Sequence, residues 1–306
     1  MKTITNVEQL KNLQLAPCVV ALGTFDGVHL GHCDVVNTAK NYAHSHNLKL
    51  MVFTFSNHPL SEIRGSLVPP LLLDNTTKEK IFAELGVDIL LNIPFTEELS
   101  QLTGQKFLQF LSINNVRAIV VGANYSYGYM GRGDVHSLQA DGPKFGFAVL
   151  VRKLIKVNGT IVSSTNIRNF IKDGRIELAK TMLGRAYNIS GTVVHGDERG
   201  RIIGFPTANI DLINSKFVLP AVGVYGGKVI TQGKTYVALL NVGSNPTFGD
   251  RGLRLEAHLL NFKGDLYGEK IVVEFHYRIR GERKFHNIQE LQEQIIRDKE
   301  EIEGLF

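Results

Sequence analysis

The residues best suited to chemistry are two histidines, His29 and His32, which stand three positions apart at the end of the segment GTFDGVHLGH. The apolar run before this segment predicts a buried parallel strand, and the residues from Asp34 onward predict a helix. Phosphate groups bind at the carboxyl ends of such strands and at helix N-termini. Two imidazoles there can donate hydrogen bonds to an α-phosphate during nucleotidyl transfer, and Gly31 leaves room for the nucleotide. We therefore expect an ATP site at this turn.

Two other interpretations of the pair remain open. In one, a histidine caps the helix while the other is a partly buried structural residue. In the other, the pair binds a metal, although the neighbouring Cys33 and Asp34 lack the spaced ligand clusters of zinc motifs. The position between a strand and a helix favours the nucleotide site.

Three more segments of the first half carry polar residues that suit a nucleotide. His58 follows the second expected strand, so it can face the same crevice or belong to a structural turn. Residues 122–134 combine tyrosines, glycines and Arg132, which suits a loop around a ring and a phosphate; a surface loop with packed tyrosines is the alternative. Residues 163–168 place hydroxyl groups at a helix start and Arg168 one turn further, where they can clamp the outer phosphates of ATP.

In the second half, the segment GRIIGFPTAN at residues 200–209 carries two neutral oxygen donors. Thr207 and Asn209 can help to hold Mg2+ together with nucleotide phosphates, which supply most of the negative charge. A plain turn followed by a strand is the alternative. Residues 223–228 suggest a phosphate-binding P-loop, but the spacing is one residue short and no Ser or Thr follows the lysine, so we reject that interpretation.

A carboxylate, Glu256, lies in the expected strand Leu253–Leu259. Alternation places it on one face with Arg254 and His258, and the leucines on the other face. There it can orient or deprotonate an attacking hydroxyl group during phosphoryl transfer. A structural ion pair with either neighbour is the alternative.

Length and composition indicate a soluble two-domain protein. The chain has 306 residues, of which 43% are hydrophobic, enough for two cores. The net charge of +5 comes from scattered basic residues, and no nucleic-acid-binding motif is visible. Only two cysteines occur, and neither a long apolar stretch nor an apolar signal core is present at the start. We expect a cytoplasmic protein with no membrane partner.

The pattern of elements changes near residue 184. Before it, apolar strands alternate with helices, which indicates an α/β domain with a parallel sheet covered on both faces. After it, short alternating strands indicate a small antiparallel barrel or sandwich, closed by an amphipathic helix at Ile288–Ile302. The expected strands are Val19–Leu22, Leu48–Phe55, Ile89–Ile93, Ala118–Val121, Ala148–Leu150, Asn188–Val194, Gly223–Ile230, Thr235–Val242, Leu253–Leu260 and Lys270–Ile279, and the expected helices of the first half are Asp34–His46, Lys78–Leu85 and Gly104–Ile113.

The motifs of the first half together resemble the nucleotidyltransferase half of the prokaryotic bifunctional riboflavin kinase/FAD synthetases, a Rossmann-like domain that transfers AMP from ATP to FMN and releases pyrophosphate. One departure is that family members commonly carry Pro-His-Pro where this chain has Asn57-His58-Pro59. The resemblance implies an ATP site at Gly23, Phe25, His29, His32, Ser164, Thr165 and Arg168, and a flavin and phosphate loop at His58, Asn124, Tyr127 and Arg132.

The second half is similar to the riboflavin kinase module, a six-stranded Greek-key barrel. The similarity rests on the segments GFPTAN, GVY, NVGSNPTF and RGERKF and on Glu256. It implies that Glu256 is the catalytic base toward the 5′-hydroxyl of riboflavin and that Thr207 and Asn209 bind Mg2+ with the nucleotide. It further implies a nucleotide site at Gly204, Pro206, Thr207 and Asn209 and flavin contacts at Arg280 and Phe285.

The sequence therefore predicts an FMN adenylyltransferase domain at residues 1–183 and a riboflavin kinase domain at residues 184–306. Both steps use ATP with Mg2+, and the partners are the small molecules ATP, riboflavin and FMN; a homo-oligomer is compatible with the sequence. Three rivals stay open: an enzyme with one working module, of which the kinase is the favoured candidate; a flavin-sensing regulator; and an adenylyltransferase for another mononucleotide.

Overall fold

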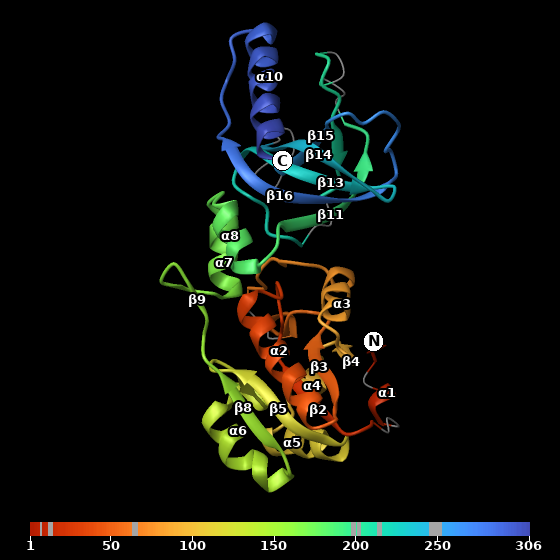
Figure 1. Cartoon of the computed structure of the whole chain (residues 1–306), viewed down its shortest axis with the longest axis vertical. Coiled ribbons are helices and arrows are strands. Elements are labelled where there is room, and N and C mark those ends of the chain that lie inside the picture. The colour runs from red at the N-terminus through yellow and green to blue at the C-terminus, as the bar shows by residue number, and fades with distance from the viewer. Residues whose placement is uncertain are drawn as a thin grey trace. The chain divides into compact units, whose positions relative to one another are not determined.

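The computed structural model describes residues 1–6, 8–11, 15–62, 67–196, 200, 203–212, 216–244 and 253–306 (Figure 1). Residues 245–248 of the NVGSNPTF motif lie outside the described residues. The chain divides into two compact units, which are described separately. The first contains Met1–Pro69 and Leu73–Ser163, and the second contains Pro70–Leu72 and Ser164–Phe306.

The first unit is built on a six-stranded parallel sheet in the order β1-β4-β3-β2-β5-β8. The strands are β1 (Lys2–Ile4), β2 (Cys18–Leu22), β3 (Lys49–Phe55), β4 (Ile89–Ile93), β5 (Val116–Gly122) and β8 (Ala148–Arg152). The chain runs outward from β2 through β3 to β4 and then returns to place β5 on the other side of β2. The order of strands thus reverses between β2 and β5, which is where open α/β sheets bind ligands.

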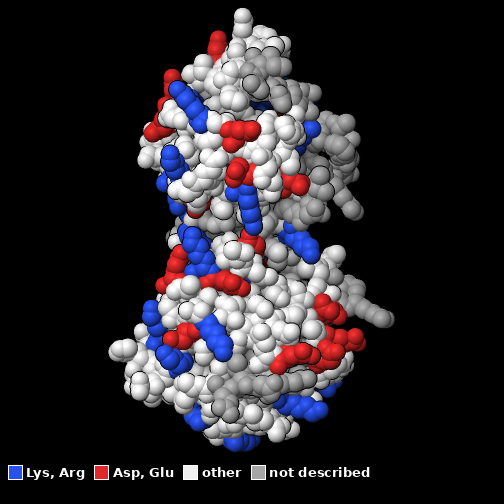
Figure 2. All heavy atoms as spheres, turned by 90° about the vertical axis from the view of Figure 1, so that its right-hand side faces the viewer, with Lys and Arg blue, Asp and Glu red and all other residues white. Residues whose placement is uncertain are grey.

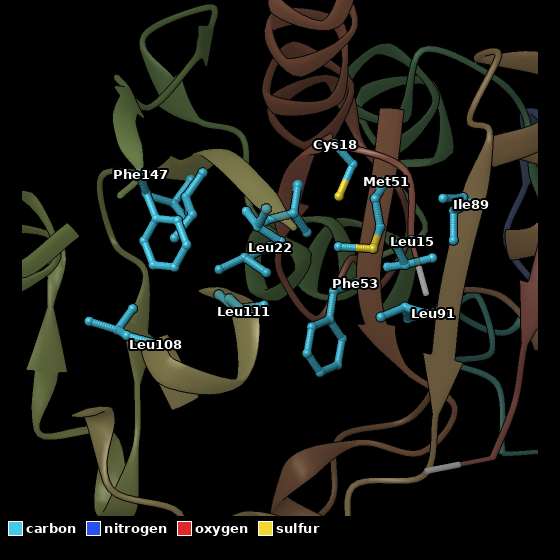
Figure 3. Close-up of a cluster of buried hydrophobic side chains, with 14 of the residues drawn as sticks. Leu15, Cys18, Leu22, Met51, Phe53, Ile89, Leu91, Leu108, Leu111 and Phe147 are labelled. Carbon is cyan, nitrogen blue, oxygen red and sulfur yellow. The ribbon is translucent and has the colours of Figure 1, made fainter. Parts of the chain in front are cut away.

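Helices cover both faces of this sheet, as the alternation of strands and helices predicted. Helices α2 (Leu30–Ser45) and α3 (Asn75–Glu84) bury residues such as Val36 and Phe82 against one face. Helices α5 (Gly104–Ile113) and α6 (Val135–Asp141) cover the other face. Figure 3 shows that second layer, in which Met51 and Phe53 of β3, Leu91 of β4 and Leu108 and Leu111 of α5 lie in one apolar cluster.

The remaining elements of the first unit are short. Strands β6 and β7 form a hairpin inside the loop that follows β5, and β9 and β10 form a second hairpin. Their bounds are α1 (Glu8–Lys11), η1 (Pro59–Glu62), α4 (Glu97–Ser100), β6 (Ser126–Tyr127), η2 (Tyr129–Gly131), β7 (Gly133–Asp134), η3 (Gly142–Phe145), β9 (Lys156–Val157) and β10 (Thr160–Ile161).

The second unit is a closed six-stranded barrel in the order β11-β12-β15-β14-β13-β16, with all pairs antiparallel. The predicted antiparallel barrel is confirmed, and the barrel alternative is favoured over a sandwich. Residues 223–228, which we rejected as a P-loop, lie inside β13. The elements are α7 (Ser164–Lys172), α8 (Ile176–Leu183), β11 (Tyr187–Val194), β12 (Ala208–Ile210), β13 (Gly223–Thr231), β14 (Lys234–Ser244), β15 (Leu253–Leu259), β16 (Lys270–Arg280) and α10 (Ile288–Leu305).

Helix α10 packs its apolar stripe on the outside of the barrel. Ile302 is fully buried, and with Ile295 it contacts Val224 of β13 and Leu239 of β14. Gly226 permits this approach, because a Cβ atom there would lie 2.9 Å from the side chain of Ile302. Among the described residues, no helix is long and apolar enough to cross a membrane. Figure 2 shows a face that carries both Lys and Arg and Asp and Glu side chains.

Helices α7 and α8 belong to the second unit, where α8 packs against β11 and β16. By packing, the division between the units therefore falls between Ser163 and Ser164, whereas our expected domain boundary lies at residue 184. The residue at which one functional domain ends and the next begins stays a prediction.

Candidate functional site

The two histidines begin helix α2 and do not precede it. His29 is the N-cap residue, and its Nδ1 atom accepts a hydrogen bond of 3.3 Å from the backbone N–H of His32. The expected helix start at Asp34 is thus wrong by one turn. Because Nδ1 of His29 accepts this hydrogen bond, a neutral His29 ring carries its proton on Nε2, which is the donor form that a phosphate oxygen requires.

The imidazole rings of His29 and His32 stack, with centroids 3.6 Å apart and an angle of 12° between the planes. Gly31 makes this possible, because a Cβ atom there would lie 3.2 Å from Cε1 of His29. The room that we expected Gly31 to leave for the nucleotide is therefore taken by the His29 ring. Capping and ligand binding are compatible, since the cap uses Nδ1 only.

The turn before the histidines is strained, a feature that the sequence motif does not reveal. Phe25 has φ of 48° and Val28 has φ of 37°, a region that non-glycine residues avoid and that is most costly for a β-branched residue such as Val28. Both side chains are buried, with 1% and 0% of their surface exposed. Such strain persists only where the surrounding packing enforces it, and it concentrates at functional sites.

Phe25 connects this turn to the core. Its ring contacts His32 and Phe82 edge-on, with centroid distances of 5.2 and 5.5 Å. Gly23 lies beside the same ring, since a Cβ atom at Gly23 would come within 3.2 Å of it. Phe25 therefore positions His32. A direct contact of Gly23 or Phe25 with ATP stays a prediction.

His58 lies at the carboxyl end of the neighbouring strand β3. Its Nδ1 atom accepts a hydrogen bond of 3.2 Å from the N–H of Leu60, and burial lowers its pKa, with the charge of Lys78 lowering it further. The preceding Asn57 joins this loop to the end of β4: its Nδ2 atom donates to the carbonyl of Phe95 (3.1 Å), and its Oδ1 atom accepts from the N–H of Phe95 (2.7 Å). The amide of Asn57 thus joins the ends of β3 and β4.

The loop after β5 holds the three other residues predicted to contact flavin or phosphate. Asn124 and Arg132 are exposed, and the Arg132 guanidinium lies 5.7 Å from the centre of the Tyr129 ring. Tyr127 is only 7% exposed, and its ring packs against Phe107 in the core. The packing thus supports the alternative of a core tyrosine at this position, and a flavin contact of Tyr127 stays a prediction.

Ser164, Thr165 and Arg168 belong to the second unit, where Ser164 and Thr165 are the first residues of α7, as predicted for a helix start. Arg168 is 7% exposed, its Nε atom donates to the carbonyl of Pro70 (2.7 Å), and burial lowers its pKa. Their assignment to a nucleotide site with His29 and His32 remains a prediction.

The barrel brings two of the candidate kinase residues, Glu256 and Asn209, together in one register position. In the sheet register, Glu256 of β15 is paired with Asn209 of β12 on one side and with Asn241 of β14 on the other. Glu256, Arg254 and His258 alternate with the buried Leu255, Ala257 and Leu259, so the predicted faces of this strand are confirmed. The sequence motif contained Asn241, but only the register places it beside Glu256.

The segment before β12 is fixed to the same face of the barrel. The Nδ1 atom of His258 lies 2.8 Å from the carbonyl oxygen of Pro206, and Nε2 of Gln292 in α10 donates to the carbonyl of Ile203 (3.1 Å). Gly204 has φ of 83°, which favours glycine. Gly196 leaves space for the side chain of Asn209, which a Cβ atom there would overlap. Thr207 and Asn209 are half-buried.

Arg280 has a structural partner. Its Nε and Nη2 atoms donate to the carboxylate of Asp298 in α10 at 2.8–3.0 Å, and this carboxylate is almost completely buried. Phe285 lies near two guanidinium groups, 5.8 Å from that of Arg280 and 4.8 Å from that of Arg283. This ion pair fastens α10 to β16, and the predicted flavin contacts of Arg280 and Phe285 remain untested.

Asp34, which we considered as a metal ligand, pairs instead with Arg152 at the end of β8, with two hydrogen bonds of 2.7 and 3.0 Å. No group of three or more His, Cys, Asp or Glu side chains that could hold a metal ion occurs among the described residues. Thr207 and Asn209 could hold Mg2+ without such a group of charged side chains. Mg2+ bound to a nucleotide takes most of its ligands from phosphates and water, so the protein needs to supply only a few oxygen atoms.

Comparison with known proteins decides the family. A family model described as FAD synthetase matches residues 11–166, and one described as riboflavin kinase matches residues 183–306. A bifunctional riboflavin kinase/FMN adenylyltransferase from Bacillus subtilis is 40% identical over 98% of this chain and 97% of its own length. The protein of the same description from Escherichia coli K12 is 36% identical over 98% and 96%. The chain belongs to the bifunctional riboflavin kinase/FMN adenylyltransferase family.

One solved structure resembles this chain over nearly its whole length. It is named a macrolide-efflux protein from Streptococcus pneumoniae, and it matches with a TM-score of 0.90 and 32% identity over 98% of both chains. That name describes the other protein only, and the likeness supports the fold described above.

One residue with unusual surroundings, Lys78, was missed by the sequence analysis. Lys78 of α3 is a cation with only 7% of its surface exposed, and its Nζ atom donates to the carbonyl of Phe55 at 3.0 Å. No sequence signal distinguishes it from the exposed Lys80 of the same helix, because its burial depends on how α3 packs over β3.

Proposed function

We propose that the strand ends of the N-terminal sheet convert FMN and ATP to FAD and pyrophosphate, and that the C-terminal barrel converts riboflavin and ATP to FMN and ADP. The proposal rests on one observation: each part of the chain carries its own polar site, the stacked His29 and His32 after β2 and the rung of Asn209, Glu256 and Asn241 in the barrel.

In the kinase step, the carboxylate of Glu256 accepts the proton of the riboflavin 5′-hydroxyl as its oxygen attacks the γ-phosphorus of ATP and ADP leaves. Thr207 and Asn209 flank one residue in an extended segment, so they project to the same side of the chain. They suit a magnesium ion that neutralises phosphate charge, since their oxygens are hard, neutral donors. The pairing of Asn209 with Glu256 supports placing the base beside the nucleotide phosphates.

In the adenylyl transfer step, a phosphate oxygen of FMN attacks the α-phosphorus of ATP, and the bond to the β-phosphate oxygen breaks. No protein base is needed, because the attacking oxygen is already ionised. His29 and His32 stabilise the charge that grows on the α-phosphate. We assign the outer phosphates to Ser164, Thr165 and Arg168. Since ATP is a substrate of both steps, we propose a cytoplasmic enzyme with small-molecule partners.

The test is chromatography of riboflavin, FMN and FAD after incubation of the full chain with Mg-ATP and either riboflavin or FMN. FAD from both starting flavins supports both steps. FMN without FAD supports the rival with a working kinase alone, and FAD from FMN alone supports the reverse. A folded protein that binds ATP and flavin but converts neither supports the flavin-sensing regulator. Omission of Mg2+ or addition of a chelator is expected to stop both steps.

A further inference from the structure

No carboxylate among the described residues pairs with the buried charge of Lys78. Its ammonium group donates one hydrogen bond, to the carbonyl of Phe55 at the end of β3, and within the described part of the chain it forms no ion pair. Ammonium groups are rarely buried unless a carboxylate or another anion accompanies them, because the loss of hydration costs several kcal/mol. The fold therefore leaves this cation to be neutralised by something that is not part of the described chain.

The charge of Lys78 is retained near neutral pH. Burial lowers its pKa to about 8, so the ammonium form still predominates at pH 7. His58 interacts electrostatically with Lys78, and protonation of the His58 imidazole would add a second positive charge to the site. The region beyond β3 thus favours an anion over a second cation.

One buried polar atom near the ends of β3 and β4 is also unpaired among the described residues. Thr54 and Asn92 are partners in the register of β3 and β4, and both are buried, with 0% and 1% exposed. Nδ2 of Asn92 donates to Oδ1 of Asn75 in the first turn of α3 (3.3 Å), while Oδ1 of Asn92 has no hydrogen-bond partner among the described residues. Buried polar atoms are rarely left in this state, which is an independent sign that a polar ligand or its water completes the cluster.

This cluster is physically continuous with the histidine turn. Phe82, one helical turn after Lys78, contacts Phe25, which in turn contacts His32. The hydroxyl group of Thr54 donates to the carbonyl of Thr24 in the turn itself (2.8 Å). All these residues belong to the first unit, so the two clusters are held in one packed layer.

Adenylyl transfer requires two phosphates side by side, and their mutual repulsion must be offset. The histidines follow β2, and Lys78 with His58 lies at the end of the adjacent strand β3. We propose that Lys78 binds the phosphate of FMN, with His58 at its flank, and so holds the attacking oxygen beside the α-phosphate of ATP. This inference rests on the proposed adenylyltransferase function and adds a residue that recognises the second substrate.

The experiment compares full-chain variants Lys78→Met, Lys78→Arg and Lys80→Met. Lys80 is the matched control, since it lies on the same helix and is exposed. FMN adenylylation is measured with FMN varied at saturating Mg-ATP and then with ATP varied at saturating FMN. Riboflavin phosphorylation and the thermal unfolding temperature are recorded for every variant. If the wild-type chain forms no FAD, the proposed adenylyltransferase function is refuted, and this failure is distinct from a failure of the role proposed for Lys78.

For Lys78→Met we expect the KM for FMN to rise about 10- to 100-fold, as for loss of a charge-assisted hydrogen bond, with the KM for ATP changed by less than about twofold. Lys78→Arg should retain part of the affinity, and Lys80→Met should match wild type. An unchanged KM for FMN in Lys78→Met overturns the proposal, as does an equal loss toward both substrates. If Lys78→Met does not fold, Lys78→Gln, whose amide can still donate to Phe55, takes its place under the same criteria.

Discussion

The two candidate sites are built by opposite means. The barrel site uses regular structure: alternation along β15 turns Glu256 outward, and the register sets it between Asn209 and Asn241. The N-terminal site uses irregular structure: a turn with two strained residues, Phe25 and Val28, and polar groups buried under α3. The first can be assembled from strand pattern and pairing alone, whereas the second depends on tertiary packing.

This difference has an energetic consequence. In the barrel, the reactive side chains are half-exposed and their strands are stabilised independently of them, so the chemistry can be removed with little cost to folding. In the N-terminal unit, His29 caps α2 and Lys78 is a buried charge, so function and stability are coupled in the same residues. Removal of the buried charge of Lys78 is therefore expected to raise stability, whereas removal of the His29 cap is expected to lower it.

The largest effect that separates the two sites is expected for Glu256→Gln. FMN formation from riboflavin should fall about 10²- to 10⁴-fold, because the amide cannot accept the hydroxyl proton, while FAD formation from FMN stays unchanged. The unfolding temperature should not change, since glutamine keeps the size of the side chain. Glu269→Gln, at an exposed position before β16, is the control. A parallel loss of both activities would show that the sites are not separate.

His29 offers a way to separate capping from chemistry. His29→Asn keeps a strong N-cap residue but removes the imidazole, so FAD formation should fall about 10²-fold or more while the stability of α2 is retained. His29→Ala should lose the same activity and in addition about 1 kcal/mol of unfolding free energy. Riboflavin phosphorylation is the internal reference, and His44→Ala in the exposed last turn of α2 is the control. Full FAD formation by His29→Asn would show that His29 serves only as the N-cap of α2.

The sequence predicted most of the fold, because periodicity is a local property. All the expected strands of both halves form, whereas β1 and β12, with three residues each, were missed because such short strands carry no periodic signal. The start of α2 was placed one turn late, since Gly31 and the histidines do not resemble a helical turn. The barrel closure and register could not be derived from local pattern.

The sites were predictable in residue type but not in surroundings. The motifs named His29, His32 and Glu256, and the structure places each at a strand end or strand face where its proposed role is geometrically possible. Arg280 could not be recognised as the partner of Asp298, since that contact joins residues from β16 and α10. Lys78 was not found for the same reason: burial of a lysine is a property of packing.

The buried charge gives the N-terminal site a pH dependence that the barrel site should lack. With a pKa of about 8, Lys78 loses its proton as the pH rises, so kcat/KM for FMN should fall about tenfold between pH 7 and pH 9. In Lys78→Arg this fall in kcat/KM with rising pH should be much smaller, because arginine stays charged. His58, whose pKa is lowered, is already neutral in this range. The same descending limb in Lys78→Arg would assign the titration to another group.

The smallest effect concerns the loop that follows β3 and contains Asn57. Asn57→Ala removes both hydrogen bonds between the side chain and the backbone of Phe95, which join the ends of β3 and β4. We expect a loss of about 1–2 kcal/mol in unfolding free energy and a rise in the KM for FMN of less than about threefold, because His58 loses its fixed position while Lys78 keeps its own hydrogen bond. Thermal unfolding and FMN-dependent kinetics measure the two effects, with Ser61→Ala as the control for the exposed end of the same network. An Asn57→Ala chain that is destabilised but has an unchanged KM for FMN would show that this loop contributes only to folding. Function and stability would then be less closely linked in the N-terminal unit than its buried polar groups indicate.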